Sequence, residues 1–190
     1  HINNKNIRTG KEMMISFGMN NWFMPCSGWL THKSLIEKAG NWNTEITNND
    51  DGEYFSRVLL NAKKVTWIPQ ILAYYRVLPE ISLSSLNTLT KVNSALNSYK
   101  LITKMLQKEK QIALLSYPKR MYFNMFNWVR HSFPNKSKEA AKEFDKLKAD
   151  CFVSKQKKLW FLITTFGLNR GMKIYDVALS VKRKFKRIVE

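Results

Sequence analysis

Apolar residues recur at helical spacing along much of this 190-residue chain. From Ser84 to Leu106 they stand three or four positions apart, which predicts one long amphipathic helix. Further helical runs cover residues 121–129, 137–152 and 173–189. We therefore expect two parts, residues 1–84 and residues 85–190, and the second part is predicted to be almost entirely helical.

The first part has a more varied pattern. Residues 13–17 and 21–24 are short apolar patches that suit strand pieces or a buried loop. Residues 31–39 have the spacing of a short helix. Val65 to Ile68 and Ile71 to Val77 are rich in β-branched and aromatic residues, so both are predicted to be strands. Helices and strands this close together indicate the edge of a mixed sheet.

Two adjacent carboxylates, Asp50 and Asp51, stand at the predicted start of a further helix. Asn49 is a favoured helix cap, and acids such as Asp50, Asp51 and Glu53 are stabilised in a first turn by the positive end of the helix. These acids could therefore be ordinary capping residues. The alternative is a chemical centre, because an ionised carboxylate on a rigid element can serve as a general base.

The order of the surrounding segments resembles the second half of the catalytic domain of family 2 glycosyltransferases. These are inverting enzymes with a GT-A fold that use nucleotide-sugar donors. The resemblance extends from about Trp22 to Ser84. It is carried by Gly28-Trp29-Leu30, the helix ending at Ala39-Gly40, Trp42, the pair Asp50-Asp51, the strand after Val65, and Tyr75-Arg76.

The resemblance implies an α/β fold, α+β in this stretch, in which residues 1–84 form the acceptor side of a glycosyltransferase domain. It implies transfer of a sugar from a nucleotide-sugar donor to a glycan or lipid-linked acceptor, as in cell-surface polysaccharide assembly. Asp51 aligns with the family's usual base, and Asp50 stands where many members have Glu. Residues 85–190 would be a helical extension.

Four further residues are candidates for substrate binding. Trp29 and Trp42 could stack on a sugar face, since aromatic rings suit its apolar C–H groups, although each could instead simply fill a core. Arg76 matches the strand-end Arg of the family and could approach the donor diphosphate, or it could be a surface residue. Glu53 completes the set.

The donor half of the family's domain is not found in these residues. There is no Asp-x-Asp triad, no glycine-rich phosphate loop and no metal-binding arrangement of His1, His32 and His131. We therefore expect a truncated GT-A domain without its N-terminal Rossmann-like half, which alone would be inactive. A longer parent protein would use Mg²⁺ or Mn²⁺, and no metal site is expected in this fragment.

Charge is distributed very unevenly along the chain. Residues 1–80 hold nine Lys and Arg against seven Asp and Glu, whereas residues 81–190 hold 23 against seven. Cations stand beside aromatic residues at 155–162 and again at 182–187, which suits an interfacial helix on an anionic membrane leaflet. A solvated helical face is the alternative.

A basic helical module that binds nucleic acid would use the same charge, but no nucleic-acid-binding fingerprint accompanies it. An interaction scaffold is a third hypothesis.

Cys26 and Cys151 are far apart and suit a reducing compartment. No apolar run reaches membrane-spanning length and no signal segment is seen. The protein is therefore expected in the cytoplasm or on the inner face of the cell membrane.

Overall fold

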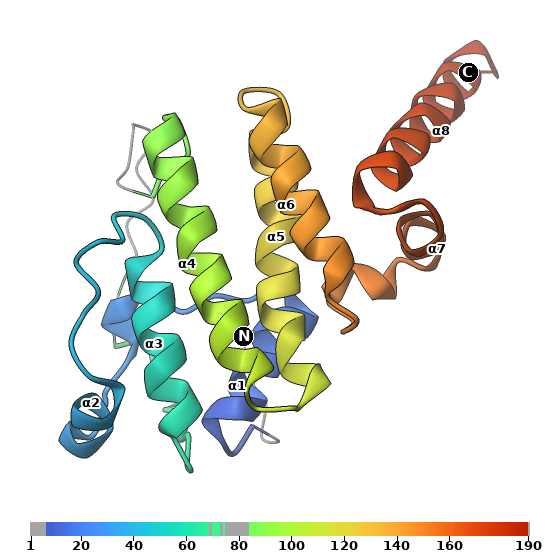
Figure 1. The fold of residues 1–190 in the computed structure, drawn as a ribbon. Helices are drawn as coiled ribbons and strands as arrows, with labels where there is room; N and C mark the ends of the chain where they lie inside the picture. Colours follow the sequence, from blue (N-terminus) through green and yellow to red (C-terminus); the bar gives the residue numbers. More distant parts are fainter. Residues whose placement is uncertain (1–6, 69, 73, 75–83, 190) are drawn as a thin grey trace.

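The computed structural model describes residues 7–68, 70–72, 74 and 84–189, with the backbone alone for residues 183–189. The described residues form helices joined by loops (Figure 1). The α-helices are α1 Gly10–Asn20, α2 Lys33–Ala39, α3 Asp50–Asn61, α4 Leu89–Gln107, α5 Ser116–Val129, α6 Pro134–Lys146, α7 Lys157–Phe166 and α8 Leu168–Val189. Short 3₁₀ helices are η1 Cys26–Gly28, η2 Ile112–Leu115 and η3 Phe152–Lys155.

The predicted α/β fold, and with it the truncated GT-A domain, is wrong for the described part of the chain, which contains no strand. Val65 to Ile68 is irregular, and its backbone makes one sheet-like contact, from the Val65 N–H to the Arg8 carbonyl at 2.7 Å. A strand needs a hydrogen-bonded neighbouring strand, and the described residues supply none at this position. Of the second predicted strand, residues 71, 72 and 74 are irregular and the others lie outside the described residues.

Helix α1 stands where a loop and strand pieces were predicted. Its start is a capping box, in which the Thr9 side chain accepts from the Glu12 N–H at 3.2 Å and the Glu12 carboxylate accepts from the Thr9 N–H at 2.9 Å. Burial of Met13, Met14 and Phe17 then anchors the helix in the core. The predicted helices at α2, α3 and α4 are confirmed.

One hydrophobic core joins the helices on both sides of residue 84. Helix α5 packs against α1, α4 and α6, and α3 packs against α1 and α4. Two glycines allow α1 to come this close: a Cβ at Gly10 would overlap the Leu59 backbone, and a Cβ at Gly18 would overlap that of Ser116. Helix α1 thus packs against both α3 and α5, although more than fifty residues separate these two helices in the sequence.

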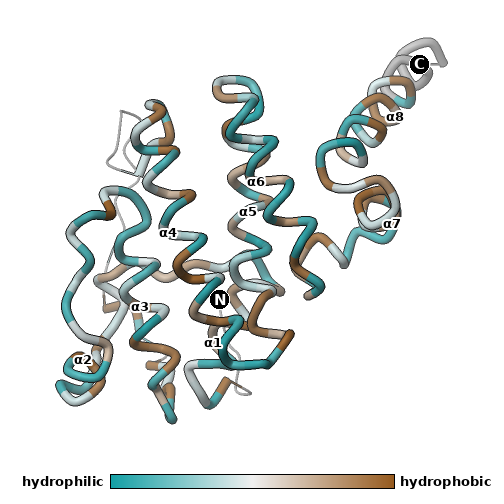
Figure 2. The backbone as a smooth tube through the Cα atoms, in the orientation of Figure 1, coloured by the Kyte–Doolittle hydropathy of each residue, from teal (hydrophilic) through white to brown (hydrophobic). Residues whose placement is uncertain are grey.

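Helices α7 and α8 lie at the far side of the bundle from α2 and α3, with α8 running outward to the C-terminus (Figure 1). Apolar and polar residues alternate along α8 (Figure 2). Among the described residues, none of the helices combines the length and hydropathy required to cross a bilayer.

Candidate functional site

The loop before α3 is tied to α4 by two serines. The N–H groups of Thr47 and Asn48 donate to the Ser94 hydroxyl at 2.8 and 3.2 Å. The Ser98 hydroxyl donates to the Asn49 carbonyl at 2.9 Å, and the Asn49 side-chain amide donates back to that hydroxyl at 2.7 Å. These bonds fix the position of the first turn of α3 relative to α4.

Asn49 occupies the N-cap position of α3, as predicted, but it does not cap with its side chain. Its backbone is left-handed, at φ 57° and ψ 31°, a conformation that Asn tolerates better than most residues. With the Asn49 amide engaged by Ser98, the Gly52 N–H in the first turn donates instead to Asp51 Oδ1 at 2.7 Å. The Asp51 carboxylate is thereby oriented on its helix.

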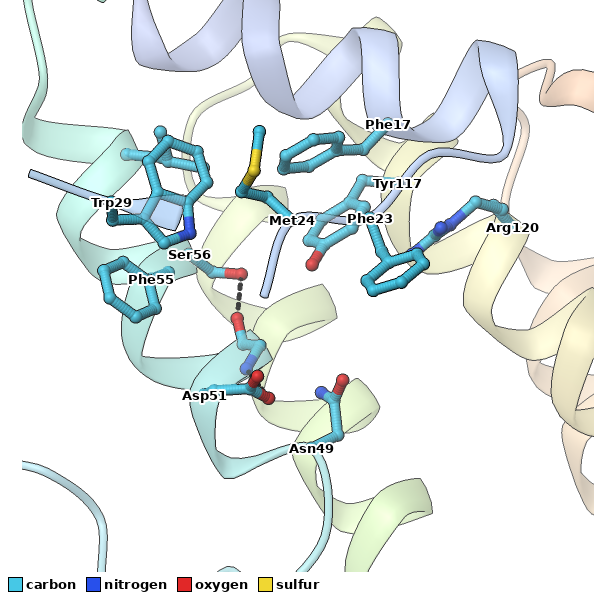
Figure 3. A pocket seen from close by; sticks show the side chains of 12 residues that line it. Phe17, Phe23, Met24, Trp29, Asn49, Asp51, Phe55, Ser56, Tyr117 and Arg120 are labelled. Carbon is cyan, nitrogen blue, oxygen red and sulfur yellow. Dashed lines mark hydrogen bonds between the residues drawn. The ribbon is translucent and has the colours of Figure 1, made fainter. Parts of the chain in front are cut away.

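Asp51 lines a pocket between α3, α5 and the segment that leads to η1 (Figure 3). Its side chain is partly buried, and burial raises its pKa above the ordinary value of 3.8. The nearby Asp50 charge raises that pKa further, whereas the hydrogen bond from Gly52 opposes the rise. A carboxylate with a raised pKa is a better proton acceptor, so the site has a base of increased strength.

Five of the twelve residues that line the Asp51 pocket are aromatic. The full lining consists of Phe17, Phe23, Met24, Trp29, Asn49, Asp51, Gly52, Phe55, Ser56, Leu59, Tyr117 and Arg120. The enclosed volume is about 100 Å³, below the several hundred Å³ typical of pockets that hold a whole small molecule. One end or one substituent of a ligand can therefore enter, while the rest lies at the mouth.

Trp29, one of the residues predicted to bind substrate, lines this pocket. Its ring stacks on Phe55 at 5.5 Å between centroids and meets the Phe17 ring edge-on at 6.3 Å. These contacts hold the indole in one orientation. At the mouth lies Phe23, which is 64% exposed.

Asp50 and Trp42 lie together on a different side of α3. The Trp42 indole N–H donates to Asp50 Oδ2 at 3.1 Å, and the indole stacks on Tyr54 at 4.5 Å. Neither residue lines the Asp51 pocket. The two adjacent carboxylates therefore have different surroundings, one in the pocket and one on an aromatic surface.

Glu53, another of the predicted site residues, is engaged in an ion pair with Arg57. Its carboxylate is nearly buried and accepts from Arg57 Nε at 2.9 Å and from Nη2 at 3.0 Å. The same guanidinium donates to the carbonyls of Ala39 and Asn41. Glu53 does not line the pocket, and its role here is to hold α3 against the end of α2.

The remaining predictions fall outside this cluster. Arg76 lies outside the described residues. In the described part of the chain, no three His, Cys, Asp or Glu side chains are grouped so that they could hold a metal ion. The described residues therefore do not fit a site for the Mg²⁺ or Mn²⁺ expected of a longer parent.

Sequence reasoning missed the contribution of α5, which supplies Tyr117 and Arg120 to the pocket. Both are nearly buried, with exposures of 7% and 8%. Burial raises the pKa of the Tyr117 hydroxyl, which stays protonated and able to donate. A local signal was available, because Lys119 and Arg120 stand among the apolar and aromatic residues of α5. Nothing in the sequence linked it to Asp51.

The chain was compared with protein-family models, with curated proteins and with solved structures, and none of them matched it.

Proposed function

We propose that this chain carries the acceptor side of an inverting sugar transfer, with Asp51 as the general base. The motifs from Trp29 to the Asp50-Asp51 pair support the reaction class through their resemblance to family 2 glycosyltransferases, although the strand predicted after Val65 is not formed in the described residues. The observation that carries the assignment of Asp51 is its position on the wall of an aromatic-lined pocket, while Asp50 lies elsewhere.

The chemistry requires one proton acceptor. An acceptor hydroxyl attacks the anomeric carbon from the face opposite the leaving nucleotide, and it must lose its proton as the new bond forms. A carboxylate that is partly desolvated and has a raised pKa suits this task. In a pocket of this size, the hydroxyl-bearing end of the acceptor would enter while the ring lies among Trp29 and Phe23 at the mouth.

The test is transfer activity in the natural protein that contains this sequence, measured as nucleoside diphosphate released from a panel of nucleotide sugars. Asp51→Asn should lower turnover by about 10²- to 10⁴-fold, the usual contribution of a general base. Asp50→Asn is the matched control and should change it by less than about tenfold. Unchanged turnover in Asp51→Asn would remove Asp51 from the mechanism.

A second candidate function is attachment to an anionic membrane surface through α7 and α8, which a separate observation favours. Lys157 and Lys158 flank a shallow apolar hollow formed with Phe161 and Leu162, and Phe161 is 65% exposed. Exposed lysines beside an exposed aromatic ring suit a headgroup layer of negative charge.

Along α8, the exposed apolar residues Ile174, Val177 and Val181 fall at spacings of three and four, which places them on one face. Sedimentation with vesicles tests this second function. Recovery should be high with phosphatidylserine vesicles and low with phosphatidylcholine vesicles, and Phe161→Ser should reduce it. Equal recovery with both vesicle types would contradict the attachment.

A further inference from the structure

Arg120 is a nearly buried charge for which the described residues provide no carboxylate. The side chain is 8% exposed and lines the pocket that contains Asp51 (Figure 3). Its Nη1 donates to the Trp22 carbonyl, and the guanidinium lies 5.3 Å from the centroid of the Tyr117 ring. Among the residues that the structure describes, Nε is buried without a hydrogen-bond partner.

The neighbouring Lys119 shows what a buried cation with a structural role looks like. Its ammonium donates to the Leu147 carbonyl at 2.6 Å and lies 4.6 Å from the Phe144 ring and 5.0 Å from the Trp160 ring. Those contacts account for its position. Arg120 has five donor hydrogens, and the described contacts engage only a minority of them.

Burying an uncompensated charge is costly, by several kcal/mol after relaxation. Burial lowers the pKa of Arg120, but a guanidinium stays protonated in proteins, so the charge cannot be removed by deprotonation. Asp51 does not neutralise it, because these two side chains form no ion pair in the described structure. In Figure 3, Tyr117 and Phe23 lie between the Arg120 guanidinium and Asp51. The pocket thus has a cationic side and an anionic side.

We propose that Arg120 binds an oxyanion, a phosphate or carboxylate group, of a ligand that enters the Asp51 pocket. This inference rests on the proposed function and specifies the substrate class. A planar guanidinium with unused donors matches the two oxygens of such a group. The oxyanion would come from one of two sources, the diphosphate of a nucleotide sugar or an acidic substituent on the acceptor sugar.

Three probes separate these sources: uridine diphosphate, glucuronate and glucose, each at millimolar concentration. The reporter is the Nε–H signal of Arg120 in nitrogen-15 NMR spectra of the wild-type chain, assigned with Arg120→Lys. At least one of the two anions should shift this signal, and glucose should not. A shift with the diphosphate alone identifies the donor as the source, and a shift with glucuronate alone identifies the acceptor.

Affinity measurements by calorimetry complete the test. Arg120→Met should weaken binding of the active anion by about 10- to 100-fold, the value of a charge-assisted hydrogen bond. Arg120→Lys keeps the charge and should lose less, and Arg170→Gln, which removes an exposed cation from α8, should lose nothing.

The proposal is overturned if neither anion shifts the Arg120 signal in the wild-type chain, or if Arg120→Met binds as tightly as wild type. Because these readouts need no turnover, they are separate from the transfer assay. Unchanged turnover in Asp51→Asn would refute the proposed function and leave a measured anion site at Arg120 intact.

Discussion

The two sides of the first turn of α3 are made of the same kinds of residue but differ in what they can do. On the inner side, Asp51 lies in a pocket with Trp29. On the outer side, Asp50 accepts a hydrogen bond from Trp42, which is 40% exposed. A Trp next to a carboxylate therefore does not make a site by itself. The Asp51 side differs because its carboxylate is enclosed, and enclosure removes water from this carboxylate and raises its pKa.

The largest effect should follow from loosening the helix that carries both sides. Glu53→Gln removes the charge that pairs with Arg57, leaving a guanidinium that is largely buried at the end of α2. The expected loss is about 2–3 kcal/mol in the free energy of unfolding, below the 3–5 kcal/mol of fully buried pairs because the Arg57 side chain is 21% exposed.

Urea unfolding followed by circular dichroism measures this loss. The matched control is Glu37→Gln, since Glu37 is paired with Lys33 at 4.0 Å on an exposed face and should contribute very little. Equal stability of the two variants would show that the Glu53 ion pair does not hold α3 in place.

A smaller effect should separate the two tryptophans. If Trp29 contacts a sugar at the pocket mouth, Trp29→Leu should weaken binding of neutral saccharides by about 2- to 10-fold, the equivalent of 0.5–1.5 kcal/mol for one aromatic contact. Trp42→Leu should leave that affinity unchanged. Titration with glucose, galactose and N-acetylglucosamine, followed by saturation-transfer NMR, gives the affinities. A loss in Trp42→Leu and none in Trp29→Leu would reverse the assignment of the two sides.

The smallest effect concerns stability and pH. The folded-state pKa of Asp51 is raised, so its ionised form costs stability at pH values above that pKa, and the cost disappears below the ordinary value of 3.8. Asp51→Asn should therefore be more stable than wild type at neutral pH, by less than about 1 kcal/mol or up to about 2–4 °C in Tm, because solvent at the partly exposed carboxylate screens the charge. The gain should shrink as the pH falls toward 3.8.

Thermal unfolding at a series of pH values tests this prediction, with Asp50→Asn as the control. That variant removes the same charge from the outer side and should show no comparable gain. A pH-independent gain in Asp51→Asn would mean that burial of the carboxylate charge is not its cause.

Sequence reasoning predicted the parts of this molecule that depend on local pattern. The apolar spacing after Asp51 predicted α3, and the spacing from Ser84 to Leu106 predicted a helix that the structure begins at Leu89, as α4. Helix α1 was not predicted, although Thr9 and Glu12 form a capping-box pattern that could have indicated its start. The error at Val65 to Ile68 came from relying on β-propensity, which describes how a residue suits a sheet and cannot supply the neighbouring strand.

The contribution of α5 to the pocket could not be predicted in the same way. Asp51 and Trp29 were identified from motifs within about sixty residues of each other, but Tyr117 and Arg120 reach the pocket only because α1 packs closely against both α3 and α5. That contact depends on two glycines and on the core as a whole. Tertiary packing decides which helices meet at the pocket, and the local periodicity of the sequence does not predict it.

The central claim, that the enclosed carboxylate of Asp51 receives the ligand hydroxyl, is tested most directly by carbon-13 NMR of the aspartate carboxyl groups. The Asp51 signal, assigned with Asp51→Asn, should titrate above pH 3.8. It should also shift when neutral saccharides are added, whereas the saccharides should leave the Asp50 signal unchanged. Titration of Asp51 at or below that value, or a saccharide response at Asp50 instead, would contradict the claim.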